Sequence, residues 1–267
     1  MVTGFDVFRE AMSQFADNFV VIGGTACDVS LANTGRTRHA TKDIDIIVIV
    51  ENLTAEFINA FWRFIKQAGY RIGKRENSVG NSVYALYRFN RPEREGYPWQ
   101  IELLARQSDL LDDSTLKIEP LKLEDSQYCL SAIVMDDDLY HFVVQHSESR
   151  EGLRMTDEYA LVCMKMVAYL NMKRDKELGL SVDENDIKKH RRDVFNLLAT
   201  GKMNDSVSVC KSIYDTYQDF IGNMAELHAE NPKVLAQSLG VNPMLVERYF
   251  ELLETIFSLE NENTICK

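Results

Sequence analysis

The sequence predicts an α+β protein in two parts: a mixed sheet flanked by helices over residues 1–150, and an all-helical domain over residues 151–267. Two observations support this class. Apolar runs of strand length alternate with helical patterns in the first part, and only helical periodicity follows it. A chain of 267 residues is long enough for one large or two modest domains.

The first part opens with a helix over about residues 4–16. Thr3 and Asp6 have the spacing of a capping box, and large apolar side chains recur behind them at helical spacing. A short buried strand, Phe19–Ile22, then runs into Gly23-Gly24. The next helix starts at Thr25 or the residue after it.

A second strand, Ile44–Val50, is apolar on both faces, which is typical of a strand in the middle of a covered sheet. Thr54 caps the helix that follows, and Gly69 ends it. Ser82–Phe89 and Trp99–Ala105 are the next two strands.

The last sheet element is predicted to be a hairpin, Ser131–Met135 with Leu139–Val144, joined by an acidic turn at residues 136–138. Beyond it, Thr156 is expected to cap one helix, and Ser181 with Glu184 to form the capping box of another. The remainder, residues 205–259, is predicted to be helical.

Two aspartates open the second strand. Because side chains alternate between the faces of a strand, Asp43 and Asp45 point the same way, with Cα atoms about 6.5–7 Å apart. Unpaired carboxylates at a buried strand are costly, and a divalent cation resolves the conflict. Mg²⁺ takes oxygen ligands, and a pair of ions can share such carboxylates.

A third acid would complete a metal site. Glu102 is the best candidate because it lies in the middle of the apolar strand Trp99–Ala105, where a lone glutamate needs a partner. Asp112 with Asp113, and the acids at 136–138, are weaker candidates because they have the character of loop residues.

The glycine pair suits phosphates. Gly23 and Gly24 lie between a strand and a helix, where they allow close backbone approach and present free N–H groups. The N-terminus of the following helix favours an anion, and Thr25 adds a hydroxyl.

These residues form a pattern. Gly23-Gly24-Thr25-Ala26, followed by Thr41-Lys42-Asp43-Ile44-Asp45, resembles the polymerase-β-like nucleotidyltransferase superfamily. The fuller pattern is similar to the AbiEii/AbiGii toxin-type nucleotidyltransferases, which have a basic residue before the acids, here Arg36 or Arg38. That family also has a lysine on a later helix, here Lys165, and a K/R-D-x-x-D-L segment, here residues 192–197, in which Asn196 replaces the last acid.

The resemblance implies a polymerase-β-like fold and transfer of a nucleoside monophosphate from an NTP to an acceptor hydroxyl on RNA, protein or a small molecule. Asp43 and Asp45 would hold two Mg²⁺ ions, and Glu102 would bind one ion and help to deprotonate the acceptor. Lys165 would meet the triphosphate. The nucleotide would also contact Gly23, Gly24, Thr25, Arg38 and Thr41. Asp193 would orient Lys165 or contact the nucleotide. A tRNA 3′ end is one acceptor in related toxins, and an antitoxin protein is an expected partner.

Bulk properties limit the partners. The net charge of −11 argues against broad non-specific binding of nucleic acid. No apolar run is long enough for a bilayer, the N-terminus lacks the basic start of a secretion signal, and five scattered cysteines form no CxxC pair. We therefore expect a cytoplasmic protein with no membrane association.

Alternatives remain open for both function and residues. A metal-dependent nuclease also uses strand carboxylates, although the lysine two residues after the acid is absent at Leu104. A catalytically silent nucleotide-binding partner is the other alternative. Lys165 could snorkel from a packed helix, Asp193 could pair with Lys189 along its own helix, and Trp99 is expected to pack rather than to stack on a base.

Overall fold

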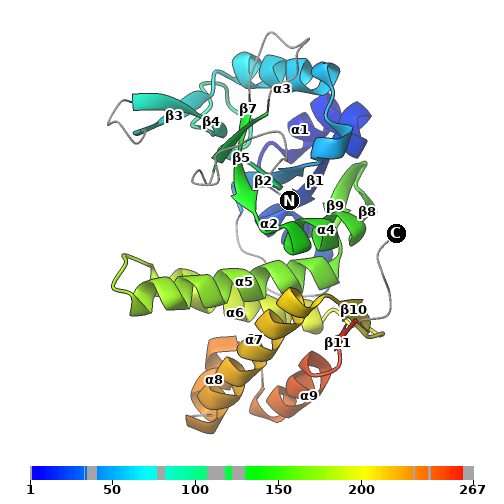
Figure 1. Ribbon diagram of the computed structural model, residues 1–267, viewed down its shortest axis with the longest axis vertical. Coiled ribbons are helices and arrows are strands. Elements are labelled where there is room, and N and C mark those ends of the chain that lie inside the picture. The colour runs from blue at the N-terminus through cyan, green and yellow to red at the C-terminus, as the bar shows by residue number, and fades with distance from the viewer. Residues whose placement is uncertain are drawn as a thin grey trace. The chain divides into compact units, whose positions relative to one another are not determined.

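A mixed sheet organises the first part of the chain, in the order β3-β4-β5-β2-β1-β9-β8, with β7 paired to β5 and β6 paired to β7 (Figure 1). The computed structural model describes residues 2–32, 34, 41–76, 82–106, 118–121, 130–230, 232–239 and 242–260. The strands of this sheet are β1 Phe19–Ile22, β2 Asp43–Val48, β3 Arg71–Glu76, β4 Ser82–Asn90, β5 Gln100–Arg106, β6 Ile118–Leu121, β7 Leu130–Met135, β8 Ser147–Arg150 and β9 Leu153–Thr156.

The strand β2 lies in the centre of the sheet, where it pairs antiparallel with β1 and parallel with β5. Its alternate residues Ile44 and Ile46 are fully buried, as is Ile101 on β5. On the same face of the sheet, Phe8 packs edge-on to Phe19, with ring centroids 5.8 Å apart. The helices that bring aromatic side chains to this face are α1 Phe5–Met12 and α3 Ala55–Ala68, and the first part also contains α2 Gly23–Ser30 and α4 Asp137–Gln145.

Helix α3 shows how the sequence sets these boundaries. Thr54 accepts a hydrogen bond from the amide of Phe57 at 3.2 Å, and Gly69 ends the helix with φ at +70°. Two short 3₁₀ helices, Ser13–Asn18 and Val50–Asn52, complete the first part. The predicted cap and stop of α3 are both confirmed, as is the α+β class with a mixed sheet flanked by helices.

The predicted hairpin at residues 131–144 is wrong in its second half. Residues 137–145 form α4, because the Asp136 carboxylate accepts from the amide of Leu139 at 3.1 Å and caps a helix. The hairpin of this region lies further along, as β8 and β9, which pair antiparallel. It spans the predicted boundary at residue 150.

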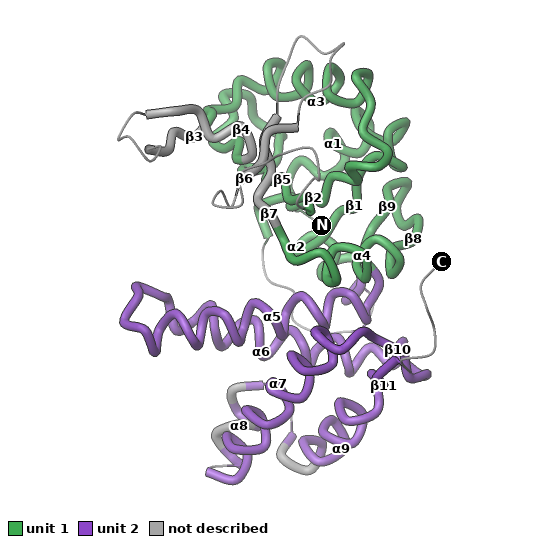
Figure 2. Tube along the Cα trace, in the orientation of Figure 1, with its two compact units in different colours: residues 1–29, 37–156 green, residues 30–36, 157–267 purple. Residues whose placement is uncertain are grey.

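The chain divides into two units: residues 1–29 with 37–156, and residues 30–36 with 157–267 (Figure 2). The second unit is largely helical, as expected, with α5 Glu158–Glu177, α6 Glu184–Leu198, α7 Lys211–Glu230, α8 Pro232–Leu239 and α9 Pro243–Leu253. It also contains two short parallel strands that the sequence did not predict, β10 Val207–Val209 and β11 Phe257–Leu259.

The caps of the second unit differ from the expected ones. Asp157, not Thr156, caps α5 by accepting from the amide of Ala160 at 2.9 Å. Asp183 caps α6, whose predicted capping box began at Ser181. Within the described residues, no helix is both long and apolar enough to cross a bilayer.

Candidate active site

Strand register brings the three predicted acids onto one face of the sheet. In the parallel pair of β2 and β5, Asp43 lies opposite Gln100, and Asp45 lies opposite Glu102. Because alternate residues share a face, both aspartates and Glu102 project from the side opposite the buried Ile44 and Ile101. Carboxylates from two neighbouring strands in the centre of the sheet therefore lie on the same face.

The glycine pair packs directly against this strand. Gly23 has φ at +66°, and a Cβ atom built there would lie 2.5 Å from Oδ2 of Asp45. A Cβ atom on Gly24 would lie 2.7 Å from the Thr41 side chain. Real Cβ atoms essentially never come this close, so glycine at both positions lets the junction of β1 and α2 lie against the side chains of Asp45 and Thr41 without displacing them.

Thr25 fastens the start of α2 to the acid strand. Its hydroxyl donates to the carbonyl oxygen of Asp43 at 2.9 Å, and the residue is 1% exposed. The sequence suggested that this hydroxyl contacts a nucleotide. In the structure it links the start of α2, which contains the glycine pair, to the backbone of β2 at Asp43. Any contact of Thr25 with a nucleotide stays a prediction.

Glu102 has a partner that the sequence analysis missed. Arg88, its register partner on β4, forms an ion pair through Nε with Oε1 of Glu102. Gln100 donates to the same oxygen at 3.2 Å. The strand containing Arg88 was predicted, but the register that sets it opposite Glu102 is a long-range property that local sequence does not encode.

The acids offer the oxygen donors that Mg²⁺ takes. Asp43 and Asp45 supply two carboxylates from one strand face, while Glu102 on the same face is engaged by Arg88 through Oε1. Over the described ranges, no three His, Cys, Asp or Glu side chains are gathered closely enough to hold a metal ion. The residues therefore fit a cation site with two carboxylate ligands, Asp43 and Asp45. The third carboxylate, Glu102, is paired with Arg88.

The second unit contains the other two predicted residues, Lys165 on α5 and Asp193 on α6. Their side chains form an ion pair at 2.8 Å and are only 7% and 3% exposed. Lys165 is therefore buried rather than snorkelling to solvent. Asp193 on α6 pairs with a lysine of the neighbouring helix α5, whereas the sequence suggested Lys189 of its own helix as an alternative partner. Their roles in binding a triphosphate stay predictions.

Polar groups surround this pair along α6. Burial, reinforced by the charge of Lys165, lowers the pKa of His190 from 6.5 to about 4, so its imidazole is neutral at pH 7. Arg191 is 9% exposed and Asn196 7%. The basic run at residues 188–192 is thus partly buried, and Lys188 is its one exposed residue.

Other predicted residues fall outside this arrangement. Arg38, Asp112 and Asp113 lie outside the described residues. Tyr97, close to the start of β5, packs against Phe64, with ring centroids 5.2 Å apart. The expectation that Trp99 packs is wrong, because Trp99 is 50% exposed.

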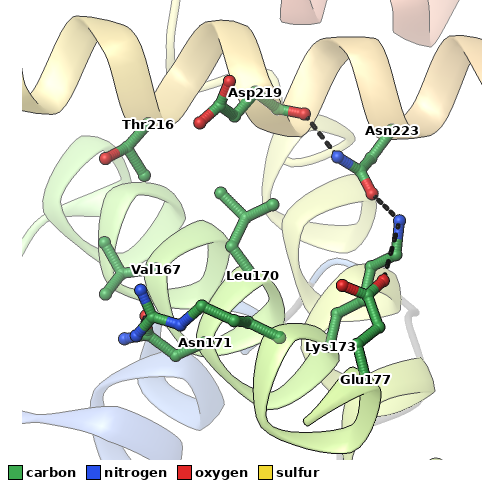
Figure 3. Close-up of a pocket in the computed structure, with 9 residues that line it drawn as sticks. Val167, Leu170, Asn171, Lys173, Glu177, Thr216, Asp219 and Asn223 are labelled. Atoms are coloured by element: carbon green, nitrogen blue, oxygen red, sulfur yellow. Dashed lines mark hydrogen bonds and ion pairs between the residues drawn. The ribbon is translucent and has the colours of Figure 1, made fainter.

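A cavity of about 400 Å³ lies between α5 and α7 in the second unit (Figure 3). Two apolar residues of α5, Val167 and Leu170, lie among polar and charged side chains of both signs. The full lining is Val167, Leu170, Asn171, Lys173, Arg174, Glu177, Thr216, Asp219 and Asn223. None of the predicted site residues contributes to it.

Comparisons with known proteins close the description. No family model and no curated protein matches the chain in sequence. The fold is similar to that of the Megavirus polyadenylate synthase, at 12% identity and a TM-score of 0.37, over 86% of this chain and 38% of that one. It is also similar to the antibiotic-resistance factor ANT(2″)-Ia, at 11% identity and a TM-score of 0.35, over 86% of this chain and 98% of that one. The chain thus spans well under half of the polyadenylate synthase chain, and at these TM-scores the likenesses carry no argument about function.

Proposed function

We propose that this chain is a Mg²⁺-dependent nucleotidyltransferase, which moves a nucleoside monophosphate from an NTP to an acceptor hydroxyl and releases pyrophosphate. One observation carries the proposal: the register that sets Asp45 opposite Glu102, with Asp43 on the same face and Gly23 against Asp45. This geometry unites the two halves of the motif, the glycine pair and the T-x-D-x-D segment.

Each element has a chemical task in this proposal. Asp43 and Asp45 would hold the cations, which neutralise phosphate charge and polarise the reacting phosphoryl group when bound. Gly23 and Gly24 admit phosphate oxygens to the backbone N–H groups at the start of α2. Glu102 would accept the proton of the acceptor hydroxyl once Arg88 releases it.

Lys165 and Asp193 belong to the proposal through the resemblance to the AbiEii/AbiGii type. There, Lys165 would meet triphosphate charge, and Asp193 would orient it. Their buried ion pair supports the second of these roles, because a carboxylate at 2.8 Å fixes the position of the ammonium group.

The acceptor and the biological setting are finer proposals. The same resemblance suggests a toxin of a toxin–antitoxin pair, with a tRNA 3′ end, a protein or a small molecule as the acceptor. A net charge of −11 requires any RNA acceptor to be met by a local basic surface rather than by the molecule as a whole.

One observation favours the silent alternative. Arg88 engages Glu102, the carboxylate proposed to accept the proton of the acceptor. If this ion pair persisted with the nucleotide bound, the protein would bind the nucleotide without transferring it. The nuclease alternative is weaker, since Leu104 occupies the position where that class has its lysine.

The test is transfer of label from an α-³²P NTP to acceptors in a cell extract with Mg²⁺. Asp43→Asn and Asp45→Asn should each abolish labelling, because each removes a carboxylate charge from the site. Asp215→Asn makes the same chemical change at an exposed ion pair of α7 and should leave labelling intact.

The outcomes separate the alternatives. Labelled product that disappears with RNase identifies RNA as the acceptor. Normal labelling by either site variant would refute the proposal. Mg²⁺-NTP binding without any transfer would favour the silent partner, and loss of RNA without label incorporation would favour the nuclease.

A further inference from the structure

The contact between Arg88 and Glu102 sits at the third carboxylate of the site. Arg88 lies on β4 directly across from Glu102, and Glu102 lies directly across from Asp45 on β2. The arginine, the glutamate and the aspartate therefore form one row across three neighbouring strands, on the same face of the sheet. The strand of Arg88 is thus separated from the strand of the proposed cation ligands, β2, only by the strand of Glu102, β5.

The ion pair can be displaced. The side chains of Arg88 and Glu102 are 45% and 17% exposed, and pairs with such access to water contribute little to stability. A divalent cation at Asp43 and Asp45 would offer Glu102 a second partner, because Mg²⁺ takes carboxylate oxygens as direct ligands. Glu102 would then have two competing partners, one of which is present only when the cation is bound.

We propose that Arg88 is a switch residue: it holds Glu102 while no divalent cation is bound, yields Glu102 to the cation, and then binds the phosphates of the nucleotide through its guanidinium group. The inference rests on the proposed function, since it requires a cation at Asp43 and Asp45. A guanidinium group is suited to the second role because its planar fork matches phosphate oxygens.

The switch predicts opposite effects of one substitution. Arg88→Met should tighten cation binding about fivefold, the scale of a partly exposed ion pair, because Glu102 no longer has to leave a partner. The same change should weaken binding of an inorganic triphosphate, because the guanidinium is gone. A residue that only supports the fold would weaken both.

The experiment measures binding rather than turnover. Mn²⁺ replaces Mg²⁺, and the free ion is counted by electron paramagnetic resonance. Tripolyphosphate, which lacks a base, is titrated calorimetrically at saturating Mn²⁺. The proteins are wild type, Arg88→Met, Glu102→Gln and the double variant, with Asp45→Asn to define the site. Arg88→Gln repeats the series if Arg88→Met does not fold.

Arg106→Met is the matched control. Arg106 lies on the same strand as Glu102 but pairs with Glu51 at 2.7 Å, so its loss removes the same charge from another ion pair. It should change Mn²⁺ affinity less than twofold. The effect of Arg88→Met on Mn²⁺ should vanish in the Glu102→Gln background, because the interaction passes through that carboxylate.

The results distinguish two failures. If wild type shows Mn²⁺ binding that Asp45→Asn abolishes, but Arg88→Met leaves it unchanged or tightens it equally in the Glu102→Gln background, the switch is overturned and the proposed function stands. If wild type shows no Mn²⁺ binding that depends on Asp45, both are overturned.

Discussion

Gly23 is the residue at which the turn proposed to bind phosphate approaches the acid strand β2. Its φ of +66° and the 2.5 Å from a built Cβ to Asp45 mean that alanine introduces both backbone strain and a clash with a site carboxylate. We expect Gly23→Ala to cost about 1–3 kcal/mol of stability and to abolish transfer. Urea unfolding and the labelling assay measure the two effects.

Gly222 provides the control for that substitution. It lies within α7, and a Cβ built there meets nothing within 4 Å. Gly222→Ala should stabilise the protein by about 0.5–1 kcal/mol, because alanine is the better helix former. Equal losses from the two changes would contradict the special role of Gly23.

His190 predicts a pH dependence of stability. Its pKa falls from 6.5 to about 4, first through burial and then through the charge of Lys165, with Lys189 adding to the effect and Asp193 and Asp186 opposing it. Between these two values the unfolded chain binds a proton that the folded chain does not. The contribution of neutral His190 to the free energy of unfolding is therefore fully present above about pH 6.5. It is lost as the pH falls toward 4, by up to about 3 kcal/mol.

The measurement compares urea unfolding at pH 7 and pH 5 for wild type and His190→Gln. The variant should lose part of the pH dependence of the unfolding free energy. An unchanged dependence would show that other groups cause it.

At this scale, a period of two along strands was enough to place Asp43 and Asp45 on one face. It also identified Glu102 as an acid needing a partner. The sequence did not reveal that the partner is Arg88, because 14 positions separate the two residues and only the register of β4 against β5 sets them opposite each other.

Among the elements, α4 shows why local patterns fail. Leu139, Tyr140, Phe142 and Val143 are buried, and their spacing fits one face of a helix as well as a short apolar strand. The three preceding acids were interpreted as a turn, whereas Asp136 acts as an N-cap. The β8–β9 hairpin was missed for the opposite reason, since Ser147–Arg150 has no apolar alternation.

The packing of α5 on α6 depends on a buried ion pair. Lys165→Met leaves the Asp193 carboxylate buried without its 2.8 Å partner, and we expect a loss of about 3–5 kcal/mol. Combining Lys165→Met with Asp193→Leu should restore much of that stability, because the isolated charge is removed. Urea unfolding measures both proteins.

The exposed pair Lys211–Asp215, one turn apart on α7, supplies the comparison. Lys211→Met should cost less than about 1 kcal/mol, because exposed pairs contribute little. A small loss from Lys165→Met, equal to that control, would show that Asp193 finds another partner.

For the whole molecule, an excess of acids sets the behaviour toward nucleic acid. With a net charge of −11, we expect a labelled single-stranded RNA of random sequence to bind more weakly than about 10⁻⁴ M at physiological salt. Fluorescence anisotropy measures this. Tighter binding that falls steeply with salt would reveal a basic surface that the total charge conceals.

The division into a mixed sheet and a helical part could be predicted because apolar runs of strand length alternate with helical patterns in the first part of the chain, and helical periodicity dominates after about residue 150. Strand order could not, since β2 pairs with β1 and β5 rather than with β3. The short parallel pair of β10 and β11 joins segments whose partners Ser208 and Ser258 are 50 positions apart, and neither three-residue strand has a pattern of its own.

The half-exposed Trp99 is an intrinsic fluorescence probe in this protein. The chain has two tryptophans. Trp62 is 7% exposed and packs edge-on to Phe89, whereas the amide of Trp99 donates to the carbonyl of Lys42, immediately before the first aspartate. Dissolved iodide reaches only the exposed indole, so the quenchable share of the emission reports on the entrance to the acid strand while the buried indole serves as an internal reference.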